Sequence, residues 1–131
     1  MKKLLVLLLL MISTTVFAEW IEVGGSIDGG VTTYADPGTI KRKGHKVVMW
    51  DLSDYKTVKE VVGKRSLSLI TRAEYDCEEE TIRTLDFYYY SGNMRRWGET
   101  VASDTNIEME AHTIIPESMN KSLLNIACSK K

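Results

Sequence analysis

Few side chains in this sequence are of the types that perform catalysis. Histidine, the usual general base near neutral pH, occurs only as His45 and His112. No strand-to-helix elbow motif presents a serine to either of them. The carboxylates are scattered and lack the spacing of a calcium-binding loop. We therefore predict no enzyme activity, no catalytic residues, no metal site and no cofactor; a hydrolase that depends on His112 is the alternative.

The two cysteines, Cys77 and Cys128, have a clearer chemistry. In an oxidising compartment such a pair is better suited to a disulfide than to nucleophilic catalysis. A bond that closes a loop of about fifty residues would stabilise the domain by roughly 4 kcal/mol. We predict a disulfide between Cys77 and Cys128, and the alternative is a pair of buried free thiols.

The start of the chain indicates that the protein is exported. Basic residues precede a continuous apolar run over residues 4–12. This run is too short to cross a hydrocarbon layer of about 30 Å as a helix. Small residues then stand at the positions that a signal peptidase reads, up to Ala18. We predict a signal peptide over residues 1–18, cleavage after Ala18 and one mature domain over residues 19–131; a retained membrane anchor is the alternative.

No cysteine lies beside this predicted cleavage site, so the mature chain is not expected to be a lipoprotein. After cleavage, no remaining segment is apolar and long enough to be a transmembrane helix. We expect a periplasmic location, and the cell surface or secretion are the alternatives.

The most distinct charged feature is a basic cluster that consists of Lys41, Arg42, Lys43 and Lys46, with His45 inside it. Such a cluster suits an anionic partner such as lipid headgroups, lipopolysaccharide or an acidic polysaccharide. A solvated loop without a partner is the alternative. Nucleic acid is not an expected partner, because the chain is exported and its formal net charge is −1.

Aromatic residues form a second candidate binding surface. Side chains alternate along a strand, so Tyr88 and Tyr90 are expected on the face opposite to Tyr89. Together with Trp97, they could form an aromatic patch for a protein partner or for self-association. The alternative is the ordinary preference of tyrosine for strands.

The elements that position these residues are mostly strands. Residues 66–77 alternate between apolar and polar side chains, which is typical of a strand with one buried face. This alternation places Cys77 on the buried face and Ser66 and Ser68 on the wet face. Further strands are predicted over residues 19–23, 31–35, 47–55 and 81–90, with shorter pieces at 100–101 and 107–111. A turn is expected at residues 36–39, and residues 56–65 are expected to form a helical turn or an irregular loop.

The strand predicted over residues 47–55 has Val48, Trp50 and Leu52 as its more apolar face. The pattern changes at residues 116–118, where proline, glutamate and serine are typical of the start of a helix. Helical spacing then gives one apolar face, which consists of Met119, Leu123, Ile126 and Ala127. Strands followed by a helix predict an α+β fold in which the helix lies across one face of a curved antiparallel sheet.

The chain also resembles a known family. Residues 34–44, 47–55, 66–77 and 116–118, followed by Cys128, are similar in type and order to the surface-adhesin protein E family of Gram-negative bacteria. The resemblance implies a single curved antiparallel sheet of about six strands, with a C-terminal helix tethered to its concave face by the disulfide.

The same resemblance implies an exported, non-catalytic binding protein. Its expected partners are host proteins, such as extracellular-matrix components and vitronectin, or components of the bacterial envelope. The alternative is a periplasmic structural or accessory envelope protein that acts through homodimerisation.

Overall fold

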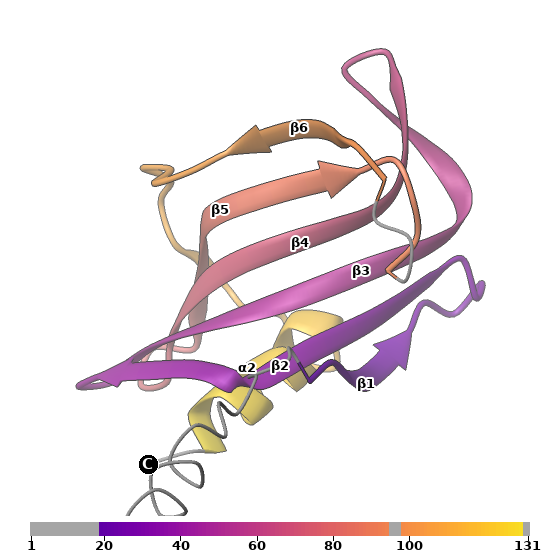
Figure 1. Cartoon of the computed structure of the whole chain (residues 1–131). Helices are drawn as coiled ribbons and strands as arrows, with labels where there is room; N and C mark the ends of the chain where they lie inside the picture. Colours follow the sequence, from indigo (N-terminus) through magenta and orange to yellow (C-terminus); the bar gives the residue numbers. More distant parts are fainter. Residues whose placement is uncertain (1–18, 95–97, 130–131) are drawn as a thin grey trace, which may run out of the picture.

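The computed structural model describes residues 19–94 and 98–129 of the chain. The predicted signal peptide and Trp97 therefore lie outside the described residues. Within the described part, the chain forms seven strands and one helix (Figure 1). These elements are β1 (Ile21–Gly25), β2 (Val31–Lys43), β3 (Lys46–Val61), β4 (Lys64–Asp76), β5 (Thr81–Tyr90), β6 (Thr100–Asp104), β7 (His112–Thr113) and α2 (Met119–Ser129).

The sheet is a simple antiparallel meander. Each strand from β1 to β6 pairs with the next strand in the sequence, so the order in space equals the order in the chain. The two-residue strand β7 pairs with the start of β5, beyond the region that β6 covers. The predicted single antiparallel sheet of about six strands is therefore confirmed.

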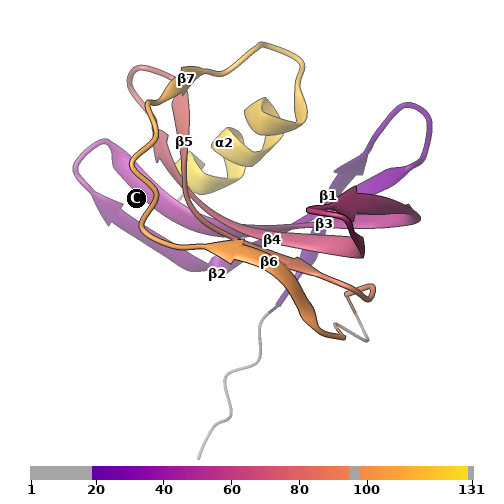
Figure 2. The ribbon, with the colours of Figure 1, turned by 90° about the horizontal axis from the view of Figure 1, so that it is seen from above.

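The helix α2 lies in the concave side of the curved sheet (Figure 2). Its buried residues Leu123, Leu124 and Ala127 pack in one core with Met49 and Tyr75 of the sheet. Burial of such apolar side chains is the main driving force that holds the two layers together. The predicted α+β arrangement of helix and sheet is thus confirmed.

The predicted disulfide is present as well. Cys77, directly after β4, is bonded to Cys128 in the last turn of α2, and their Cα atoms are 5.8 Å apart. The amide of Cys77 also donates a hydrogen bond to the carbonyl oxygen of His45 at 2.8 Å. The bond therefore joins the end of the helix to the end of the sheet at which the β2–β3 hairpin turns.

Two segments differ from the sequence-based prediction because strand pairing extends further than local signals indicate. Residues 56–65 are neither a helical turn nor an irregular loop, because β3 and β4 continue as a long hairpin that turns at Val62 and Gly63. The expected turn at residues 36–39 is a bulge inside the continuous strand β2, where the register shifts between Asp36 and Lys41.

Further corrections concern boundaries. Residues 107–111 are not a strand; pairing resumes only at β7. The first strand is not interrupted at Gly24 but continues to Gly25, and the Met119 side chain lies only 3.3 Å from the position of a Cβ atom at Gly24. The helix begins at Met119, later than predicted, and Ser118 caps it because its Oγ accepts a hydrogen bond from the Lys121 amide at 3.2 Å.

The faces of two strands were also predicted incorrectly. The helix covers the face of β3 that carries Val47 and Met49, rather than the face that carries Trp50. Ser66 and Ser68 are fully buried instead of wet. Their hydroxyls donate hydrogen bonds to the carbonyl oxygens of Tyr90 and Gly92, at 2.8 and 2.6 Å, which allows small polar side chains to occupy a buried position.

Candidate functional site

An aromatic groove lies on the sheet face that points away from α2. Alternation along β3 produces it, because Met49 packs beneath the helix while Trp50 points to the other face. The rings of Trp50 and Tyr88 lie at a centroid distance of 6.1 Å. The groove has a volume of about 330 Å³ and is lined by Trp20, Asp36, Thr39, Trp50, Ile70, Tyr88 and Tyr90. Its rings suit contact with apolar or aromatic side chains of a partner.

The bulge in β2 supports one edge of this aromatic groove. The Asp36 carboxylate accepts a hydrogen bond from the amide of Gly38 at 3.0 Å, and the Thr39 hydroxyl donates to the carbonyl oxygen of Asp36 at 2.6 Å. The backbone amide of Trp50 donates to the Thr39 hydroxyl oxygen at 3.0 Å. These bonds hold the bulge against β3 directly beside the Trp50 side chain.

The structure places two of the three predicted aromatic residues in the groove. Tyr88 and Tyr90 share this face, while Tyr89 makes an edge-to-face contact with Phe87 at 5.6 Å on the other face. Sequence reasoning missed Trp20 and Trp50 as members of the groove, although the alternation of β3 against a buried Met49 is a signal that could have identified Trp50. A binding role for these residues stays a prediction.

An ion pair lies beside the groove, on the strands that form its floor. Arg72 Nε of β4 donates to Asp86 of β5, whose other carboxylate oxygen accepts from the amide of Asn106 at 2.7 Å. The hydrogen bond from Arg72 lowers the pKa of the Asp86 carboxyl group, and the charge of Arg72 adds to this effect. The pair therefore fixes the segment after β6 to the sheet.

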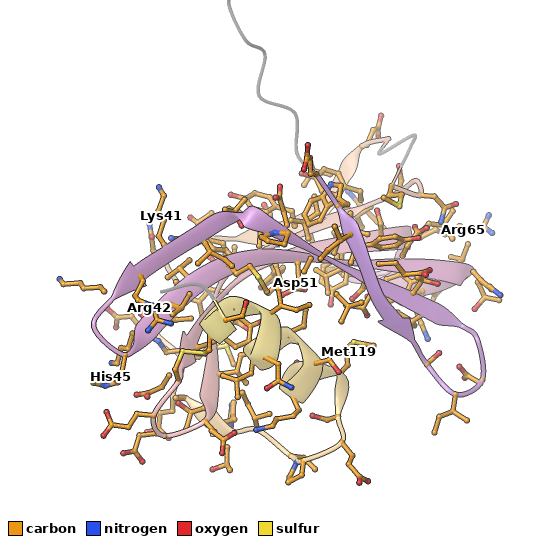
Figure 3. The ribbon with its side chains drawn as sticks, turned by 90° about the horizontal axis from the view of Figure 1, so that it is seen from below. Lys41, Arg42, His45, Asp51, Arg65 and Met119 are labelled. Atoms are coloured by element: carbon orange, nitrogen blue, oxygen red, sulfur yellow. A yellow bond between two sulfur atoms is a disulfide. The ribbon has the colours of Figure 1, made fainter. Side chains whose placement is uncertain are left out.

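A second hollow, the concave cavity, lies on the helix side of the sheet. Its volume is about 610 Å³, and Asp51 lies on its floor. Figure 3 shows Asp51 on the sheet beside α2, and Met119 at the start of the helix. The lining consists of Thr33, Asp51, Ser53, Thr71, Ile82, Thr84, Met109, Glu110, His112, Thr113, Ile115, Ser118, Met119, Asn120 and Leu123.

The Asp51 carboxyl group has an unusual environment. Asp51 is only 8% exposed, and no hydrogen bond or ion pair reaches its carboxylate from the described residues. Burial raises its pKa to about 7, because a charged carboxylate loses hydration there. Asp51 in turn contributes to raising the pKa of Tyr75, for which burial is the main cause. Sequence reasoning missed Asp51 because the opposite face of β3, which carries Trp50, was predicted to be the more apolar one. Asp51 is recognised as buried only when the face that carries Met49 is known to pack beneath the helix.

The basic cluster is divided by the structure. Lys41, Lys43 and Lys46 are exposed on the β2–β3 hairpin. Figure 3 shows Lys41 and His45 of this hairpin at one end of the molecule. Arg42 is also exposed, but its guanidinium donates to the carbonyl oxygens of Gly44 at 3.2 Å and Cys128 at 3.3 Å. Arg42 therefore joins the hairpin to the end of α2, while the three lysines remain candidates for an anionic partner.

A second basic segment was not predicted. The β3–β4 hairpin carries exposed Lys56, Lys59, Lys64 and Arg65 against one acidic residue, Glu60. Figure 3 shows Arg65 at the end of the sheet opposite to Lys41 and Arg42. These residues were overlooked because the segment was expected to form a helical turn or an irregular loop. Without a predicted hairpin, its basic side chains could not be placed together on one part of the surface.

Comparison with known proteins identifies the family. A sequence model of the family described as surface-adhesin protein E matches residues 20–129. The chain belongs to this family. No curated protein sequence matches the chain.

Solved structures of Haemophilus influenzae protein E share this fold. Its selenomethionine form has a TM-score of 0.61 and 12% sequence identity, with 90% of this chain and 92% of that chain covered. A second crystal form has a TM-score of 0.59 and 13% identity over 89% and 92% of the two chains. A further structure of protein E has a TM-score of 0.59 and 14% identity over 89% of each chain. At these identities, the likeness establishes the fold and leaves the partners to be argued from this chain's own surface.

Membership of the family supports a surface-adhesin-like protein, and family and fold together suggest a non-enzymatic one. Within residues 19–94 and 98–129, no cluster of three or more His, Cys, Asp or Glu side chains could hold a metal ion. Among the same described residues, no helix has the length and apolar character needed to cross a membrane.

Proposed function

We propose that the protein is an exported, non-catalytic binding protein whose aromatic groove takes a segment of a protein partner. The observation that carries this proposal is the groove itself. Trp50 and Tyr88 meet on a sheet face that the helix leaves open, and Trp20 and Tyr90 extend the same apolar surface. Aromatic residues are enriched at the centres of protein interfaces, where they bury large areas with few lost rotamers.

The expected partners are proteins of the extracellular matrix or of the bacterial envelope. Family membership supports this class of partner, and the predicted signal peptide over residues 1–18 would deliver the protein to the compartment where such partners occur. Exposed lysines on both hairpins would add long-range attraction for acidic partners, which mainly increases association rates.

The test compares two neighbouring tyrosines on opposite faces. Purified protein would be titrated against immobilised extracellular-matrix proteins and purified envelope proteins, with Tyr88→Ala and Trp50→Ala as groove variants and Tyr89→Ala as the matched control. Loss of a core groove contact should weaken binding about tenfold or more, since interface hot spots contribute about 2 kcal/mol or more. Equal affinities of Tyr88→Ala and Tyr89→Ala for a bound partner would contradict the proposal.

The second candidate is a periplasmic accessory protein that acts as a homodimer. The same open aromatic face favours it, because self-association would bury Trp50 and Tyr88 against their counterparts. Sedimentation of the wild-type protein at high concentration tests this candidate. A concentration-dependent dimer that Tyr88→Ala abolishes and Tyr89→Ala retains would support it, and a strict monomer would exclude it.

A further inference from the structure

The concave cavity is distinct from the aromatic groove, because the two hollows lie on opposite faces of the sheet. Its floor carries Asp51, which is more than nine-tenths buried and has no hydrogen-bond partner among the described residues. A buried carboxylate without a partner is destabilising, and proteins usually pair or hydrogen-bond such groups. A carboxylate left in this condition at the bottom of a cavity points to a ligand that supplies the missing donors.

Hydroxyl groups surround this carboxylate on three neighbouring strands. Thr71 of β4 lies directly opposite Asp51 in the sheet register. Ser53 follows two residues later on the same face of β3, and Thr33 of β2 lies directly opposite Ser53. All three side chains line the cavity with Asp51. Since opposite and diagonal neighbours on one face have Cβ atoms about 4.5–8 Å apart, these groups can converge on one small ligand.

The charges around the concave cavity favour a cation. Besides Asp51, its lining contains Glu110 and His112, and no Lys or Arg is among the described lining residues. The positive end of the α2 dipole lies at the rim and would favour an anion, but Ser118 already caps the Lys121 amide there. The buried carboxylate, once ionised, attracts a cation more strongly than the capped helix end attracts an anion, because it then carries a full charge in a desolvated site.

We propose that the concave cavity binds a primary alkylammonium group, with the Asp51 carboxylate as counter-ion and the hydroxyl oxygens of Thr33, Ser53 and Thr71 as further acceptors. An ammonium group has three N–H donors and no acceptor, which matches one carboxylate with neighbouring hydroxyls. A cavity of about 610 Å³ also has room for the alkyl chain, alongside Met119 and Leu123. The group comes either from a free small amine or from a lysine side chain of a partner.

Ammonium binding and the ionisation of Asp51 are coupled. The cation binds the charged carboxylate, so affinity rises with pH through the region in which Asp51 ionises, about pH 7. Among the described residues, the other titratable groups near Asp51 are Tyr55 of β3 and Tyr75 of β4, while Glu110 and, from β7, His112 line the same cavity. Burial raises the pKa of both tyrosines, so they ionise far above this range.

The experiment is a titration of the isotope-labelled protein, monitored by amide NMR signals, with three ligands of equal chain length: 1-aminobutane, 1-butanol and butyrate. The variants are Asp51→Asn, Thr71→Val and a matched surface control, Asp104→Asn, whose carboxylate is exposed and bonds only the adjacent Thr105 amide among the described residues. We expect saturable shifts at Ser53 and Thr71 with 1-aminobutane alone. Asp51→Asn should weaken this binding at least tenfold, Thr71→Val severalfold, and Asp104→Asn not at all.

Several results would overturn the proposal: equal shifts with 1-butanol or butyrate, undiminished binding by Asp51→Asn, or no saturable shift with 1-aminobutane. The amide spectrum of each variant shows whether it is folded. A second test needs no variant: the affinity of the wild-type protein for 1-aminobutane should rise between about pH 6 and pH 8. Repeating the titration with Nα-acetyl-lysine amide distinguishes the sources, since comparable affinity supports a lysine side chain and exclusion supports a free amine. None of these results depends on the aromatic groove, so the two proposals can fail separately.

Discussion

The guanidinium of Arg42 donates a hydrogen bond to the backbone carbonyl oxygen of Cys128, with Nη2 and the oxygen 3.3 Å apart. The two residues are 86 positions apart in the chain, and Cys128 is also the helix partner of the disulfide. The last carbonyl groups of a helix lack partners inside the helix, and a cation near them is favourable. Since α2 has no basic residue in its own last turn, the β2–β3 hairpin supplies this cation from outside.

Arg42→Ala should therefore lower the free energy of unfolding by about 1 kcal/mol, the usual contribution of one hydrogen bond, because the carbonyl loses its charged donor. The measurement is urea-induced unfolding followed by circular dichroism. Lys41→Ala is the matched control, since it removes a neighbouring exposed basic residue from the same strand. A similar loss of stability in both variants would show that the contact with Cys128 contributes nothing.

Removal of the disulfide should have a larger effect. The bond closes a loop between positions separated by 51 residues, so replacing Cys77 and Cys128 together by serine should lower the free energy of unfolding by about 2–4 kcal/mol. Thermal unfolding of wild-type and double-variant protein measures the difference. Wild-type protein treated with reductant should behave like the variant, and an unchanged midpoint after complete reduction would contradict this expectation.

Asp51 should make the protein less stable as pH rises. Burial raises its pKa in the folded protein to about 7, above the value of about 3.9 for an unfolded chain. Between these two values the folded state binds more protons than the unfolded state, so stability is highest below about pH 4 and is lost as pH rises towards 7. By this linkage, Asp51 should reduce stability by roughly 2–4 kcal/mol across this window.

Asp51→Asn tests this effect, because an amide of the same shape does not ionise. We expect the variant to be more stable than wild type at pH 8 and to show a smaller difference at pH 5, measured by urea unfolding at both values. Asp104→Asn, at an exposed position, should follow the wild-type curve. A wild-type advantage at pH 8 would mean that the folded protein stabilises the Asp51 charge.

The pair of Arg72 and Asp86 should act in the opposite direction. The Arg72 hydrogen bond lowers the pKa of Asp86, so the contribution of the pair is present above the ordinary carboxyl pKa of about 4 and is lost as pH falls below that value. Asp86→Asn should lower the free energy of unfolding by about 1–3 kcal/mol at neutral pH, the range for hydrogen bonds to charged groups. The difference from wild type should shrink on acidification, and a difference that is constant down to about pH 3 would contradict this assignment.

Local patterns in the sequence predicted the elements that depend on local spacing. Alternation over residues 66–77 and helical spacing after Met119 follow from the geometry of a strand and a helix, so they are readable without knowledge of the rest of the chain. Export and the cysteine pair together predicted the disulfide. The β3–β4 hairpin was missed because residues 56–61 mix charged side chains with two valines and show no alternation, and their strand conformation depends on pairing with β4.

The candidate sites depended far more on tertiary structure. Trp50 and Tyr88 are 38 positions apart, and only the register of β3, β4 and β5 brings their rings together. The basic cluster was visible as a run of residues, yet only the folded chain shows that Arg42 turns towards the helix end. A sequence lists such groups, whereas contacts between strands decide which of them converge.

The sequence by itself determined the fold class, the disulfide partners and the likeness to the surface-adhesin protein E family, because these depend on residue types, their periodicity and their order. Tertiary structure alone decided that the helix lies on the Met49 face of β3. That choice buries Asp51 in a cavity and leaves Trp50 open on the other side. The physical reason is that successive side chains along a strand point to opposite faces of the sheet. Once one face packs against the helix, the environment of every residue on both faces is fixed.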